Sequence, residues 1–228
     1  MPPLSEDELR RLEGQVPCSI PSDVAELLRY ARGFRIQNRL LHGGKWHLSE
    51  VDLSGLDAQF GLEEVFPHGS CMADDGAGNE WIIDLTSDSK VWGPIFFACH
   101  DPPAVVFHTA NLTHFMEEVL KGIESPETTE IYRMQGELTS QVWRENPGVL
   151  GFEECVDSAD HDLRAFAQSL DASYEFVDLR KAKLGDGFSW GRYGSLTANR
   201  RFGEKRIFAY QKKTEKTRWQ RLQEFWRG

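Results

Sequence analysis

The chain contains only four cysteines, and no two of them are close enough in the sequence to form a CxxC pair. They are Cys18, Cys71, Cys99 and Cys155. This wide spacing argues against a zinc ribbon or a redox motif, because both use closely spaced thiols. It favours small, buried, free thiols in a reducing compartment.

Long apolar runs are also missing. No stretch approaches the roughly 18 consecutive apolar residues that indicate a membrane-spanning helix. The first residues, MPPLSEDELRR, are acidic where a secretory signal would be basic and then apolar. We therefore predict a cytoplasmic protein that does not bind membranes.

The sequence lacks the motifs that usually carry chemistry. It has no GxSxG, P-loop or GxGxxG pattern, and its seven histidines are scattered without an HExxH context. The acidic residues between positions 74 and 84 do not have the spacing of a calcium-binding loop. These observations predict a protein with no catalytic residues, no bound metal and no cofactor, that is, not an enzyme.

Apolar and aromatic residues are well represented. Hydrophobic residues make up 40% of the 228-residue chain, and seven of the aromatic residues are tryptophans. A chain of this size can bury one substantial core, or one domain with a structured extension.

Charge is divided unevenly along the chain. Residues 1–175 contain 12 Lys and Arg against 31 Asp and Glu, whereas residues 176–228 contain 14 against 5. Either the basic segment packs on the acidic part and neutralises it, or each part binds a partner of opposite charge. We favour the first interpretation, since interleaved charges stabilise a compact protein without any ligand.

The most informative stretch is MADDGAGNEWIIDL, at residues 72–85. Asp75-Gly76 is a hairpin signal. Gly76 and Gly78 tolerate the positive φ angles that tight turns require. The alternation after the turn predicts a strand with Trp81, Ile83 and Leu85 on one side of a sheet, and Ile82 and Asp84 on the other.

Helix signals precede and follow this hairpin. Ser5 and Glu8 have capping-box spacing for a first helix that ends near Gly14, and Ser22 starts a second helix that ends before Gly33. A third helix, over 115–123, is capped by Asn111 or Thr113. Its predicted buried residues are Phe115, Val119 and Leu120.

Further strands and helices complete the predicted fold. Strands are predicted over 34–41, 46–51, 91–98, around 105–107, over 174–179 and over 206–211; a short helix is the alternative for 46–51. Helices are predicted within 127–150 before a Pro147-Gly148 turn, over 160–170 and over 217–226. Strands bracketed by helices indicate an α+β fold, with a central, mostly antiparallel sheet flanked by helices and an α+β C-terminal extension.

The order of these features resembles the SUKH superfamily, named for a yeast cell-wall synthesis regulator and the bacterial immunity proteins that share its fold. The matching pieces are Pro21 through Gly33, Met72 through Leu85, Trp92, His100-Asp101 and the helix from Phe115 to Leu120. Residues 125–228 have no counterpart in the family pattern. The resemblance implies a SUKH-like domain over 5–124. For residues 125–228 we predict, from their own pattern, an α+β extension that packs on this domain.

The resemblance also implies a binding protein, since most bacterial members neutralise a toxin and fungal relatives act as interaction hubs. We therefore predict a bacterial immunity protein whose partner is a basic toxin domain, such as a nuclease. The predicted partner-binding residues are the acidic Asp74, Asp75, Glu80, Glu63 and Glu64, with Trp92 as an exposed aromatic anchor. Turn geometry with a solvated acidic rim is the alternative explanation of the same carboxylates.

A second functional hypothesis concerns the basic segment 176–228, in which aromatic residues alternate with cations. The aromatic residues are Trp190, Tyr193, Phe202, Phe208 and Tyr210, and the cations are Arg192, Arg200, Arg201, Lys205, Arg206, Lys212 and Lys213. Such a pattern suits a nucleic-acid surface. It also suits a half-buried strand pair, which we favour.

Overall fold

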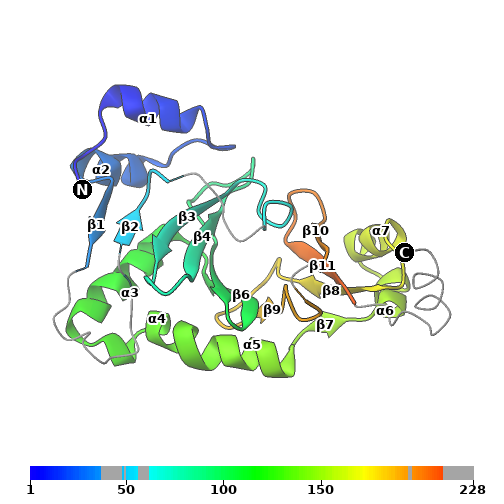
Figure 1. The fold of residues 1–228 in the computed structure, drawn as a ribbon. Coiled ribbons are helices and arrows are strands. Elements are labelled where there is room, and N and C mark those ends of the chain that lie inside the picture. The colour runs from blue at the N-terminus through cyan, green and yellow to red at the C-terminus, as the bar shows by residue number, and fades with distance from the viewer. Residues whose placement is uncertain (37–47, 49, 56–61, 195–196, 213–228) are drawn as a thin grey trace, which may run out of the picture.

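The computed structural model describes residues 1–36, 48, 50–55, 62–194 and 197–212, and it has the predicted α+β fold (Figure 1). Within these residues, seven strands form one sheet in the order β1-β2-β3-β4-β5-β6-β9, and four form a second in the order β10-β11-β8-β7. Every strand pair is antiparallel. The larger sheet contains β1 (Gly33–Arg35), β2 (Glu50–Asp52), β3 (Gly69–Asp74), β4 (Glu80–Asp84), β5 (Ile95–His100), β6 (Pro103–Thr109) and β9 (Gly187–Phe188). The smaller contains β7 (Val149–Leu150), β8 (Tyr174–Asp178), β10 (Asn199–Arg201) and β11 (Ile207–Gln211).

The two N-terminal helices begin and end close to the predicted positions. The capping box of α1 (Glu6–Glu13) is formed, with Ser5 and Glu8 bonding each other's backbone N–H. In α2 (Ser22–Tyr30), the cap position belongs to Pro21, and Ser22 is the first helical residue. Both helices pack their apolar side chains against the larger sheet.

The hairpin of β3 and β4 has the predicted alternation. Trp81, Ile83 and Leu85 join the core formed with α1, α2 and α3 (Leu112–Glu124), whereas Ile82 joins a core on the other face of the sheet. Every residue of β4 is buried. The strand is therefore covered on both faces.

Asn111 caps α3 through its side chain, and Phe115 and Val119 are buried as predicted. The prediction that Leu120 is buried is wrong, because 61% of its surface is exposed. The buried stripe of α3 runs through Phe115, Val119 and Gly122, at the i, i+4, i+7 spacing of one helix face. Leu120 follows Val119 by one residue, about 100° around the helix, and so faces away from the core.

Short helices follow α3 in the second half of the chain. They are α4 (Glu130–Arg133), the π-helical turn η3 (Met134–Leu138), α5 (Thr139–Glu145), α6 (Phe152–Val156) and α7 (His161–Gln168), with the 3-10 turn η2 (Pro126–Thr128) before α4. The predicted turn is present after α5, where Asn146 and Gly148 both have positive φ angles.

The C-terminal extension shares a core with the segment before it. Strand β9 of the extension pairs with β6, and a Cβ atom at Gly187 would lie 2.1 Å from the carbonyl oxygen of Val105, so only glycine fits there. Phe208 and Tyr210 of β11 pack in one cluster with Phe66 and Phe96. The domain boundary at residue 125 stays a prediction, because this core extends across it.

Some predictions fall outside the described residues. They are the closing helix over 217–226, most of the strand over 34–41 and the beginning of the element over 46–51.

Candidate functional site

The turn between β3 and β4 is organised around Asp75. Its Oδ1 accepts hydrogen bonds from the backbone N–H groups of Ala77 and Asn79 at 2.8 and 3.0 Å, and its Oδ2 accepts one from Asn79 Nδ2 at 2.6 Å. Gly76 and Gly78 have φ angles of 70° and 91°. The Asp75 carboxylate therefore shapes the turn, and only 5% of the residue is exposed.

The six predicted partner-binding residues do not form one exposed face. Asp75, Glu80 and Trp92 are all buried, so the expectation of Trp92 as an exposed anchor is wrong. Trp92 belongs to the main core, beneath the sheet face that the N-terminal helices cover. The sequence shows that Trp92 has apolar neighbours in the chain. It does not show which other elements pack over Trp92 and bury it.

The other three acidic residues keep some exposure. Glu63 and Glu64 are exposed, and Glu64 forms an ion pair with Arg200 of the extension. Asp74 is half-buried, and its Oδ1 accepts a hydrogen bond from the backbone N–H of Gly76 at 2.8 Å. An acidic rim exists here, but intramolecular contacts occupy part of it.

Glu80 is a buried carboxyl group beside the thiol of Cys71, which is only partly buried, as is Cys18, contrary to the prediction of buried thiols. Burial, together with the nearby carboxylates of Asp74 and Asp75, raises the pKa of Glu80 above its ordinary value. Burial and the adjacent Glu80 carboxylate raise the pKa of the Cys71 thiol to about 12. Cys71 therefore stays protonated, and like the other three cysteines it is free.

We expect the Glu80→Gln variant to be more stable than the wild-type protein at pH 7. Because the folded-state pKa is raised, the folded state carries the cost of an ionised, buried Glu80 above that pKa. The stability difference should shrink as the pH falls through the folded-state pKa, and vanish below 4.5, where both states are protonated. Urea unfolding at several pH values measures it, with the exposed Glu63→Gln as control. A variant less stable at pH 7 would contradict the prediction.

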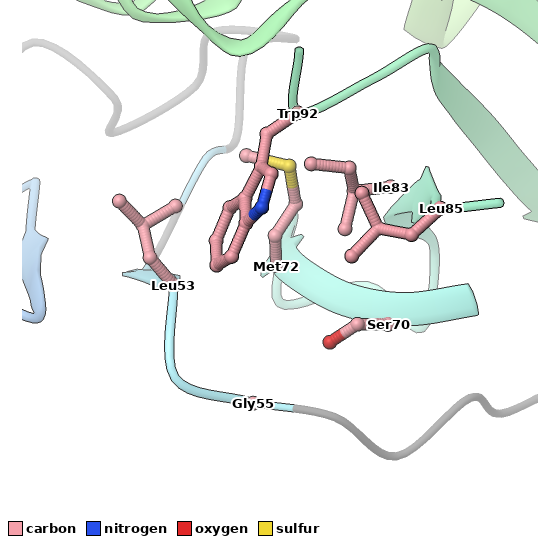
Figure 2. Close-up of a pocket in the computed structure, with 7 residues that line it drawn as sticks. All are labelled: Leu53, Gly55, Ser70, Met72, Ile83, Leu85 and Trp92. Carbon is pink, nitrogen blue, oxygen red and sulfur yellow. The ribbon is translucent and has the colours of Figure 1, made fainter. Parts of the chain in front are cut away.

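A small internal cavity lies beside the hairpin (Figure 2). It is lined by Leu53, Gly55, Ser70, Met72, Ile83, Leu85 and Trp92. The Ser70 hydroxyl and the Trp92 indole N–H are buried without a hydrogen-bond partner. The cavity volume of about 10 Å³ is close to the minimum for one water molecule. The cavity is thus too small for an organic ligand.

A polar cluster fixes α3 against α4. The Nδ1 atom of the buried His108 accepts a hydrogen bond from Trp81 Nε1 at 3.1 Å, so the N–H of the neutral ring is at Nε2, which faces Glu130 at 3.5 Å. Burial lowers the pKa of His108, and contacts with His108 and then His114 lower the pKa of Glu130 to about 2. The carboxylate of Glu118, on α3, accepts a hydrogen bond from the backbone N–H of Glu130 at 2.6 Å.

In its described part, residues 176–194 and 197–212, the basic segment packs on the acidic part of the chain, as we favoured. Asp84, which is completely buried, binds Arg201 and Arg206, each at 2.7 Å. Lys205 pairs with Asp162 at 2.6 Å. These contacts join the basic segment to β4 and α7.

The aromatic residues of this segment are largely used in packing. Phe208 and Tyr210 are fully buried, and Phe208 stacks on Phe188 with ring centroids 5.2 Å apart. Trp190 donates a hydrogen bond to the carbonyl of Cys99 at 3.2 Å. These described side chains are therefore not presented for stacking on nucleotide bases. Lys213, also in the predicted nucleic-acid surface, lies outside the described residues.

Large apolar side chains are exposed near the N-terminus of α3 and along it. Val91 is 54% exposed, and on α3 Leu120 and Ile123 are 61% and 48% exposed. Val91 borders an open groove of about 450 Å³ between the N-terminal ends of α2 and α3. Sequence reasoning missed this surface because it assigned Leu120 to the core.

The described residues contain neither a metal-binding cluster nor a membrane-spanning helix. No group of three or more His, Cys, Asp or Glu side chains in them could hold a metal ion. None of the helices in the described part of the chain is both long and apolar enough to span a bilayer.

Comparison with known proteins gave one family. The family model described as SMI1 / KNR4 family (SUKH-1) matches residues 3–118. No curated protein and no solved structure gave a match to the chain. The family match covers α1 through most of α3, including the hairpin and Trp92.

Proposed function

Because the chain belongs to the SMI1 / KNR4 (SUKH-1) family, we propose that it is a protein-binding protein, and specifically an immunity protein that neutralises a cognate toxin. The family match carries this proposal. It covers the elements that the sequence resemblance had assigned to the SUKH pattern, and that resemblance implies stoichiometric binding.

The proposed mechanism is occlusion of a basic toxin domain, with no chemical step performed by this chain. The chain as a whole carries a formal net charge of −10, which would accelerate the encounter with a cationic surface. Apolar contacts made after the encounter would slow dissociation. The proposed place of action is the cytoplasm, before the toxin reaches its target.

Purification of the intact chain from its own cells tests the proposal. We expect one protein to co-purify in a fixed stoichiometry, to be toxic when expressed alone, and to lose its toxicity when the chain is co-expressed. The matched control is co-expression of a chain with Phe208→Ala and Trp81→Ala, which would not fold stably. A co-purifying partner with no toxicity, or toxicity that the chain does not relieve, would overturn the immunity role.

A further inference from the structure

The exposed apolar residues Val91, Leu120 and Ile123 lie on or near α3, whose N-terminal end borders the groove. We call these residues, together with the half-buried Met116 and the groove, the α3 surface. Met116, Leu120 and Ile123 follow one another at i, i+4 and i+7, so they form a stripe along one side of α3. Exposed apolar side chains that adjoin one another, unlike scattered single ones, mark interaction sites on soluble proteins.

The groove continues this stripe toward α2. Its walls include the apolar Val24, Val91, Trp92 and Leu112, and the α3 residues Thr113 and Glu117 lie along its edge. A volume of about 450 Å³ is enough for one or two large apolar side chains, on the scale of known binding pockets. Of these apolar residues Val91 is exposed and the other three are buried, so the surface offers a recess of mixed polarity next to an apolar stripe.

The helix that carries the stripe is held firmly in place. Phe115 and Val119 anchor one face of α3 in the core, and Glu118 binds the backbone of α4. Since a fixed helix loses little conformational entropy on binding, such a surface is pre-organised for a partner.

The border of the α3 surface is predominantly acidic. Asp23 and Glu117 line the groove, and Glu117 and Glu124 flank the stripe on its solvent side, seven residues apart. Lys90 and His114 also line the groove, and Lys121 of α3 pairs with Glu118 at 3.3 Å, so Asp23, Glu117 and Glu124 leave the border with an excess of negative charge. A complementary partner therefore presents an apolar face bordered by positive charge.

We propose that the α3 surface is the docking site for a basic amphipathic helix of the protein partner. This inference rests on the proposed function for the existence of a partner, and it adds the location and chemistry of the contact. Apolar side chains of the helix enter the groove and cover Leu120 and Ile123. Its Lys or Arg residues face Glu117 and Glu124. The carboxylates at the β3–β4 turn are not required.

The test uses the full chain and a synthetic 18-residue peptide as probe. The peptide is an amphipathic helix with leucines at i, i+3, i+4 and i+7 and lysines elsewhere; a matched peptide has glutamates in place of the lysines. NMR titration of the ¹⁵N-labelled chain locates the binding site, and fluorescence anisotropy gives Kd. We expect the lysine peptide to perturb residues 90–92 and 113–124, and the glutamate peptide to bind at least tenfold more weakly.

Two double variants separate apolar contact from charge. Leu120→Asp with Ile123→Asp should raise Kd for the lysine peptide at least tenfold, whereas Tyr30→Asp, at an 84% exposed position at the other end of α2, should change it less than twofold. Glu117→Lys with Glu124→Lys should reverse the preference between the two peptides. Circular dichroism confirms that each variant is folded.

Several outcomes would overturn the proposal. They are no binding of the lysine peptide, perturbations centred elsewhere, an equal effect of Tyr30→Asp, or a dimer of the wild-type chain that Leu120→Asp dissociates, since a second copy would then occupy the surface. A toxin that co-purifies but is bound equally by the Leu120→Asp, Ile123→Asp variant would refute the α3 surface and leave the immunity role standing. If the lysine peptide binds but no toxin partner is found, the α3 surface stands and the immunity role is refuted.

Discussion

Replacement of Asp84 by asparagine is expected to destabilise the protein by about 3–5 kcal/mol, the usual cost of removing one partner from a buried ion pair. Asp84 is completely buried and its carboxylate contacts two guanidinium groups. The Arg201 side chain is itself only 2% exposed. Without the carboxylate, Arg201 would keep its charge in the interior, and the amide N–H of asparagine would face one of the two cations.

Urea unfolding at pH 7 measures this loss. The matched control is Glu6→Gln, which breaks the ion pair between Glu6 and Arg29 at an exposed site, where the two side chains are 63% and 48% exposed. Such an exposed pair contributes little to stability, because solvent screens the two charges. Equal small losses for Asp84→Asn and Glu6→Gln would show that the extension does not depend on this ion pair.

Replacement of Phe208 by alanine is expected to cost about 3–5 kcal/mol, the typical penalty for emptying a buried phenylalanine site. The Phe208 ring lies between those of Phe66 and Phe188, with centroid distances of 5.9 and 5.2 Å. Phe66 precedes β3, whereas Phe188 and Phe208 belong to the extension. The cavity would therefore weaken packing on both sides of residue 125.

Hydrogen exchange followed by mass spectrometry tests whether the two parts unfold together. We expect the Phe208→Ala variant to lose protection in β4 and in β11 to a similar extent, because one core stabilises both strands. The control is Tyr30→Ala, at an exposed aromatic residue, which should leave protection in both strands unchanged. Loss of protection in β11 alone would show that residues 125–228 form an independent domain.

These two predictions concern the face of the larger sheet opposite to α3. Residues of α3 belong to the core shared with α1 and α2, whereas Phe208 and Phe188 belong to the core on the other face. In Figure 1 the smaller sheet, α6 and α7 lie at the far end of the molecule from α3. We therefore expect Asp84→Asn to weaken the fold without changing peptide affinity at the α3 surface, under conditions where it remains folded.

Local signals in the sequence determined the ends of several elements. The capping box of Ser5 and Glu8 and the cap at Asn111 act through hydrogen bonds within four residues, so each is visible in a short window. The alternation along β4 also assigned Trp81 and Ile82 to opposite faces of the sheet. The family pattern was visible for the same reason, since it consists of such local segments in a fixed order.

The candidate site depended on contacts that no short window contains. Asp75 and Glu80 looked like an exposed acidic rim, but a turn and a covered sheet bury them. Leu120 has an apolar side chain of the kind usually found in a core, and only the packing of α3 shows that it faces outward.

The sequence by itself determined the class of fold, the family and the separation of charge along the chain. The tertiary structure decided which charges are used inside the molecule and which apolar residues are left outside it. Asp84 meets Arg201 across 117 residues of chain, so the pairing depends on how the extension packs on the sheet. Burial is a property of both surfaces in a contact, and the sequence of one segment describes only one of them.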